Sequence, residues 1–172
     1  MSAGLPANAP ANALTIAPAA HAHALHIVVR VGGERFAFPV SHVEEALDSP
    51  AVEWVPVAPA GMLGQLPHRG RMIGAWDAGA VFRLPRAAAG GAALVLRDTE
   101  RRLAIVVDDV MEMWRIDEAE IRPVPDGADI EGVLSGVCFV SQGGSALVNV
   151  VDVEALTALV SSRGTLEEGM TP

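Results

Sequence analysis

Residues 32–47 read GGERFAFPVSHVEEAL, and no other stretch says as much about the architecture of this chain. Gly32 and Gly33 are a two-residue turn signal, because glycine adopts the left-handed backbone conformations that tight hairpin turns require. Short apolar runs lie on both sides of the turn, at 25–31 and 35–40, and runs of this length bounded by turn residues are typical of β-strands. The stretch therefore predicts a β-hairpin.

The second half of the chain repeats this pattern weakly. With an offset of 67 residues, Phe36 falls on Leu103, and with an offset of 68, Gly64 falls on Gly132. Asp98-Thr99-Glu100 takes the place of the Gly-Gly turn. The matching strand segments are 25–31, 35–40 and 74–77 in the first half and 92–97, 103–107 and 149–152 in the second. Self-similarity at a fixed offset predicts two copies of one β-unit.

These observations predict an all-β protein of two small β-barrels, at 25–90 and 91–160, joined through the PRAAAGG stretch at 85–91. Units of this size bury little surface alone, so we expect the two barrels to share a core. Apolar residues at helical spacing within 151–162, with Asp152 at the N-cap position, predict a helix at the end of the second barrel. Residues 1–24 are expected to form a disordered leader and 161–172 a flexible tail.

Composition excludes several classes of function. The chain has 172 residues, 51% of them hydrophobic, and a formal net charge of −9, which argues against nucleic-acid binding. All twelve basic residues are arginine, so Schiff-base chemistry and a lysine-bearing phosphate loop are both ruled out. The single cysteine excludes an intrachain disulfide or a multi-cysteine metal site. With neither a signal peptide nor a long apolar run, we expect a cytoplasmic protein without direct membrane insertion.

The stretch GGERFAFPVSHVEEAL resembles the opening of the CheW family, in which a turn and a short strand precede Pro and Val-x-Glu, here Pro39, Val43 and Glu45. Four further stretches resemble family segments in the same order, at 55–77, 103–116, 121–136 and 146–156. The resemblance implies two SH3-like five-stranded β-barrels with a groove between them, no catalytic activity and no cofactor. It also implies a chemotaxis adaptor that binds the regulatory domain of a CheA-type histidine kinase and the cytoplasmic tip of a chemoreceptor.

The resemblance assigns receptor binding to Arg69, which matches the Arg of the family's Arg-Gly motif, and to its neighbour His68. The family usually has Asn-Leu where this chain has Pro67 and His68. An ordinary surface arginine that caps a turn is the alternative for Arg69. The resemblance does not identify the residues that contact the kinase, and it leaves open an adaptor for pilus-based motility or for another kinase pathway.

A small β-barrel hydrolase that uses His68 or Cys138 is the remote alternative. Cys138 lies in the apolar run GVCFV, with neither a nucleophile elbow nor an oxyanion helix around it. Asp108 and Asp109 are adjacent in the sequence, and neighbours on a strand point to opposite faces, so they cannot act together on one bond or metal. The sequence thus predicts no catalytic residue and no metal site.

Overall fold

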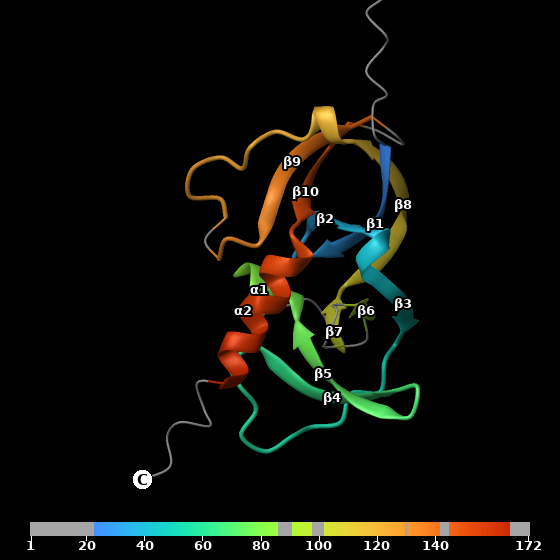
Figure 1. Cartoon of the computed structure of the whole chain (residues 1–172), viewed down its shortest axis with the longest axis vertical. Coiled ribbons are helices and arrows are strands. Elements are labelled where there is room, and N and C mark those ends of the chain that lie inside the picture. The colour runs from blue at the N-terminus through green and yellow to red at the C-terminus, as the bar shows by residue number, and fades with distance from the viewer. Residues whose placement is uncertain (1–22, 86–90, 98–101, 130, 142–144, 166–172) are drawn as a thin grey trace, which may run out of the picture.

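The computed structural model describes residues 23–85, 91–97, 102–129, 131–141 and 145–165. Within them, ten strands form two five-stranded mixed sheets (Figure 1). Sheet A has the order β8 (Asp109–Asp117), β1 (His23–Val31), β2 (Glu34–Pro39), β10 (Ala146–Val151) and β9 (Leu134–Val140). Sheet B has the order β3 (Val43–Asp48), β6 (Ala92–Arg97), β7 (Arg102–Val107), β5 (Arg71–Asp77) and β4 (Met62–His68). The prediction of a mostly β fold with two five-stranded units is confirmed.

The two sheets have the same strand order once each element is replaced by its counterpart in the other half of the chain. The pair β1–β2 corresponds to β6–β7, and β8, β9 and β10 correspond to β3, β4 and β5. Each sheet therefore combines the first two strands of one half with the last three strands of the other. This arrangement corrects the expected division into barrels at 25–90 and 91–160, because neither sheet consists of one continuous half.

The exchange has a physical cause in the length of two connections. Only Asp108 separates β7 from β8, and a chain needs about two residues to reverse its direction in a hairpin. The strand therefore continues forward, leaves sheet B and enters sheet A. In the first half, β2 reaches β3 through a single turn of 3-10 helix, η1 (Val40–His42), and the chain crosses in the opposite direction.

The structural counterpart of Gly64 is Gly136, which corrects the expected match to Gly132. A Cβ at Gly64 would collide with the carbonyl of Glu53, and a Cβ at Gly136 would lie 2.6 Å from the carbonyl oxygen of Arg122. At both places an isolated β-bridge brings the preceding segment against the strand. The close backbone approach, which only glycine permits, therefore repeats in β4 and β9.

Three apolar clusters form the core. One lies inside each sheet and includes residues from both of its edge strands, so each sheet curls around its own interior. The largest cluster lies between the sheets and contains residues of both sheets and both helices. The expectation that the two units share a core is confirmed. The buried members contributed by the two helices are Ala78, Val81, Val153, Leu156 and Val160.

The helix α2 (Val153–Thr165) confirms the predicted C-terminal helix. Asp152 is its N-cap, since Oδ1 accepts the Ala155 backbone N–H at 2.9 Å. The helix continues into the residues expected as a tail, and 166–172 lie outside the described part. A second, five-residue helix, α1 (Ala78–Phe82), was not predicted; the Asp77 side chain caps it by accepting the Gly79 N–H at 3.0 Å.

The Gly32-Gly33 turn is confirmed, with φ of 58° and 88° at the two glycines. Asp108 supports it, because Oδ2 accepts the Gly32 N–H at 2.9 Å. Of the expected leader, residues 23 and 24 belong to β1. Residues 1–22, most of the linker at 86–90 and the expected turn at 98–100 lie outside the described residues. Among the described helices, none has the length and apolar character needed to span a membrane.

Candidate partner-binding surfaces

The β4–β5 hairpin presents Arg69 at its tip. Arg69 has φ 47° and Gly70 has φ 75°, so both central residues of this two-residue turn adopt the left-handed conformation. A left-handed backbone is uncommon for a residue other than glycine. The Arg69 side chain remains 61% exposed, which makes it available to a partner.

Arg69 is also fixed from within the protein. Its Nη1 lies 2.7 Å from Oε1 of Glu44, and its Nη2 lies 3.7 Å from Oε2 of Glu45. The second oxygen of Glu44 accepts a hydrogen bond from Nε of Arg102 at 2.8 Å. Burial by itself would raise the pKa of Glu44, but the Arg102 hydrogen bond and the charges of Arg102 and Arg69 outweigh it and hold this pKa below its ordinary value. Glu44 thus stays ionised and anchors both arginines.

His68 lies beneath the hairpin and is not part of its surface. Its side chain is 4% exposed, and Nε2 lies 3.0 Å from Oε2 of Glu45. The other ring nitrogen, Nδ1, is buried and has no hydrogen-bond partner among the described residues. His68 and Arg69 thus both contact Glu45 Oε2, and the buried ring of His68 is not exposed for direct contact with a partner.

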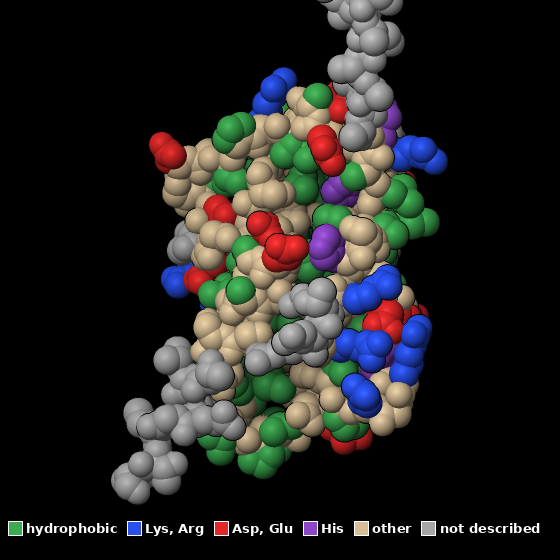
Figure 2. Space-filling model, viewed as in Figure 1, with side chains coloured by type: hydrophobic (Ala, Val, Ile, Leu, Met, Phe, Trp, Pro, Cys, Tyr) green, Lys and Arg blue, Asp and Glu red, His purple; other side chains and the backbone are tan. Residues whose placement is uncertain are grey.

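An exposed apolar pair lies next to this charged group. Pro67 and Met72 face each other across the β4–β5 ladder, and Met72 is 46% exposed. On this side of the molecule, near β3 and the β4–β5 hairpin, Figure 2 shows basic side chains gathered around acidic and histidine side chains. We call Arg69, Glu45, Pro67 and Met72 the hairpin surface.

A second exposed apolar surface lies between β3 and β4. Trp54 and Val57 are 76% and 83% exposed, and Val57 has φ 58°, which is unfavourable for a β-branched residue. Glu53 and Gln65 hold the segment in place by exchanging two backbone hydrogen bonds of 2.6 and 2.8 Å. The segment is therefore ordered, and its apolar side chains face solvent. We call Trp54 and Val57 the loop surface.

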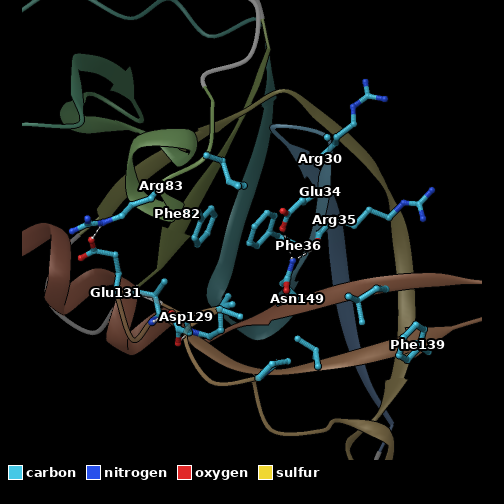
Figure 3. A pocket seen from close by; sticks show the side chains of 18 of the residues that line it. Arg30, Glu34, Arg35, Phe36, Phe82, Arg83, Asp129, Glu131, Phe139 and Asn149 are labelled. Carbon is cyan, nitrogen blue, oxygen red and sulfur yellow. Dashed lines mark hydrogen bonds and ion pairs between the residues drawn. The ribbon is translucent and has the colours of Figure 1, made fainter.

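A groove of about 1010 Å³ opens between sheet A and α1 (Figure 3). Phe36 of β2 and Phe82 of α1 stack in it, with ring centroids 4.2 Å apart and an interplanar angle of 8°. Leu147 and Phe139 line it from β10 and β9. Neither the hairpin surface nor the loop surface contributes a residue to its lining.

The residues considered for catalysis do not meet. Cys138 is 1% exposed in the interior of sheet A, and burial, together with the charge of Glu120, raises the pKa of its thiol. His68 belongs to the other sheet, paired with Glu45. The side chains of Asp108 and Asp109 bind separate partners, the Gly32 N–H and Arg30. The part of the chain that the structure describes contains no group of three or more His, Cys, Asp or Glu side chains that could hold a metal ion.

Comparison with known proteins agrees with this architecture. The model of the CheW-like domain family matches residues 26–160. The scaffolding protein TtCheW from Thermoanaerobacter tengcongensis has a similar fold, with a TM-score of 0.67 and 18% identity over 76% of this chain and 89% of that chain. No curated protein is similar enough in sequence to be matched. The family match covers well over half of the residues, and the chain belongs to the CheW-like domain family.

Proposed function

We propose that this chain is a cytoplasmic adaptor that binds the regulatory domain of a CheA-type histidine kinase and the cytoplasmic tip of a chemoreceptor. Membership of the CheW-like family is the observation that carries the proposal. The family consists of non-enzymatic scaffolds that couple receptors to CheA in chemotaxis, which agrees with the predicted absence of catalysis. Such an adaptor transmits a signal by holding its partners in a defined geometry.

For the receptor, we propose the hairpin surface. Arg69 offers a planar fork of donors that suits a carboxylate, and the neighbouring Pro67 and Met72 offer apolar contact area. Glu44 already holds the guanidinium in place, so binding loses little side-chain freedom. This arrangement suits a helix that carries apolar residues and at least one carboxylate.

His68 takes part in this proposal as a positioning residue. Its ring supports Glu45 from below at 3.0 Å, and Glu45 borders Arg69. Replacement by Leu removes that hydrogen bond while keeping an apolar volume in the buried site. We expect His68→Leu to weaken receptor binding less than a change at Arg69, and restoration of the bond by His68→Gln to recover part of the loss.

For the kinase, we propose the loop surface. Trp54 and Val57 are large apolar side chains that a folded protein rarely leaves exposed together without a partner. Tryptophan is also the residue type that most often dominates the energy of a protein interface. The loop surface and the hairpin surface share no residue, as an adaptor that binds two partners requires.

Parallel affinity measurements with a purified receptor tip and a purified kinase regulatory domain test both assignments. Arg69→Gln should weaken receptor binding about tenfold and leave kinase binding unchanged, whereas Trp54→Ser should weaken kinase binding about thirtyfold and leave receptor binding unchanged. Arg71→Gln, a change at an exposed neighbour of the same hairpin, is the matched control. Equal losses for both partners, or no loss for either, would contradict the assignment of the two surfaces.

A further inference from the structure

The groove between sheet A and α1 belongs to neither surface assigned above, and its apolar part extends out of the cavity. Leu147 and Phe139 are paired in register on β10 and β9, and they are 49% and 68% exposed. Met111, another lining residue, is 37% exposed. Phe36 and Phe82 stack in the same groove, and we call these two rings the phenylalanine seam. The groove thus offers exposed apolar side chains in addition to the stacked rings.

The carboxylates that line the groove are already satisfied within the protein. Glu131 pairs with Arg83 and, at 3.2 Å, with Nη2 of Arg163. The hydrogen bond from Arg83 is the main reason that the pKa of Glu131 lies below its ordinary value. Asp129 accepts two backbone N–H groups at 3.0 and 2.9 Å, and Glu34 accepts the side-chain amide of Asn149 at 3.2 Å.

The arginines at the open end of the groove are not satisfied in this way. Arg30 and Arg35 face each other in the β1–β2 register, and like charges placed directly opposite destabilise a sheet. In the part of the chain that the structure describes, Arg35 has no ion-pair partner, and Arg30 has only a 3.5 Å contact with a half-exposed Asp109. Figure 3 shows both side chains extending from the β1–β2 hairpin at the rim of the groove. The groove lining contains as many carboxylates as arginines, but Arg30 and Arg35 lie at its open end without a close carboxylate partner among the described residues. Their guanidinium groups are therefore available to the carboxylates of a partner.

The backbone beside the groove favours a helical occupant over an added strand. β9 is an edge strand of sheet A, but Val137 at its centre already exchanges two backbone hydrogen bonds with Arg122, at 2.7 and 2.9 Å. A peptide strand could not continue the ladder past this point. Contact through side chains, as an amphipathic helix makes in a groove, needs no free backbone groups.

We propose that this groove is a third docking site, which binds an acidic amphipathic helix of a protein other than the receptor and the kinase. The apolar face of that helix packs on Phe139, Leu147 and the phenylalanine seam. Its flanking Asp or Glu side chains pair with Arg30 and Arg35. The occupant is identified by these two features together, an apolar stripe at helical spacing and carboxylates along one flank.

A phage-displayed library of helical peptides, selected on the full-length chain, is the probe. We expect the enriched peptides to carry acidic residues beside an apolar i, i+3, i+4, i+7 stripe. Phe139→Ser should weaken their binding about thirtyfold, as for an aromatic at the centre of an interface, and Arg35→Glu about tenfold, with a shallower dependence on salt. Arg115→Glu on β8, which lies outside the groove lining, is the matched control and should leave binding unchanged.

Two further measurements keep the outcome decisive. Thermal melting must show that the three variants are folded, and hydrogen exchange with bound peptide should show protection in β2, β9 and β10. No enriched peptide, enrichment of basic peptides, or binding that neither groove variant weakens would overturn the proposal. Displacement of the peptides by the receptor tip or the kinase domain would also overturn it, because the groove would then serve one of those partners. Failure here leaves the hairpin and loop assignments untouched, since their variants lie elsewhere.

Discussion

Leu156→Ala tests whether α2 holds the two sheets together. Leu156 is 0% exposed and belongs to the cluster between the sheets, which also contains Val29 of sheet A and Ile105 of sheet B. Removal of a fully buried leucine side chain loses its transfer free energy and leaves a cavity, at a cost of about 2–5 kcal/mol. For a chain of this length each kcal/mol lowers Tm by about 2–4 °C, so we expect a decrease of roughly 4–20 °C.

The same substitution at a half-exposed position is the control. Leu147 is 49% exposed, so Leu147→Ala should cost about 1 kcal/mol, half of the transfer free energy of the removed groups and no cavity. Urea denaturation followed by circular dichroism gives both free energies of unfolding, and an unchanged m-value shows that the comparison is valid. If Leu156→Ala loses no more stability than Leu147→Ala, α2 is not part of the shared core.

Three further predictions concern single features. Gly64→Ala and Gly136→Ala should each lower Tm by more than Gly33→Ala. An added Cβ collides with backbone or side-chain atoms at Gly64 and Gly136 and meets nothing within 4 Å at Gly33. Differential scanning calorimetry of the three variants would measure the differences in Tm. Glu131→Gln should reduce the loss of stability in acid, because the folded-state pKa of Glu131 is depressed. The ionised Glu131 therefore contributes to the free energy of unfolding above its ordinary pKa of 4.5, and this contribution is lost as pH falls below that value through the folded-state pKa. Urea titrations between pH 3 and pH 6 would measure the difference between the two proteins. Asp152→Ala should cost about 1 kcal/mol through loss of the α2 cap, and Asp152→Asn should retain most of it; equal losses for the two changes in urea titrations would contradict the capping role.

Local signals in the sequence were sufficient for the β1–β2 hairpin and for α2. Gly32-Gly33 needs only a positive φ at two positions, and Asp152 caps its helix three residues away. The exchange of strands between the halves could not be read from such signals, because strand pairing depends on residues far apart in the chain. The sequence did contain one signal of the exchange, the single residue between Val107 and Asp109, which is too short for a hairpin turn. This signal can be used only when the ends of β7 and β8 are already known.

The candidate site was predictable in part. The family resemblance selected Arg69, and the structure places it at an exposed hairpin tip, but its bond to Glu44 joins residues on different strands that no local pattern connects. His68, which was expected to bind the receptor together with Arg69, is buried, because alternation along β4 turns it inward on the far side from Pro67. The exposure of Trp54 had no signal in the sequence, since tryptophan is more often buried.

Co-sedimentation with receptor-bearing membranes tests most directly whether this chain couples a receptor to a kinase. Membranes that contain a chemoreceptor are mixed with a CheA-type kinase, with and without the purified chain, and the kinase in the pellet is measured. We predict that the kinase sediments with the membranes when the chain is present. Arg69→Gln should reduce the fraction of kinase in the pellet by weakening receptor binding, and Trp54→Ser should reduce it by weakening kinase binding. An equal amount of pelleted kinase with and without the chain would contradict the proposed function.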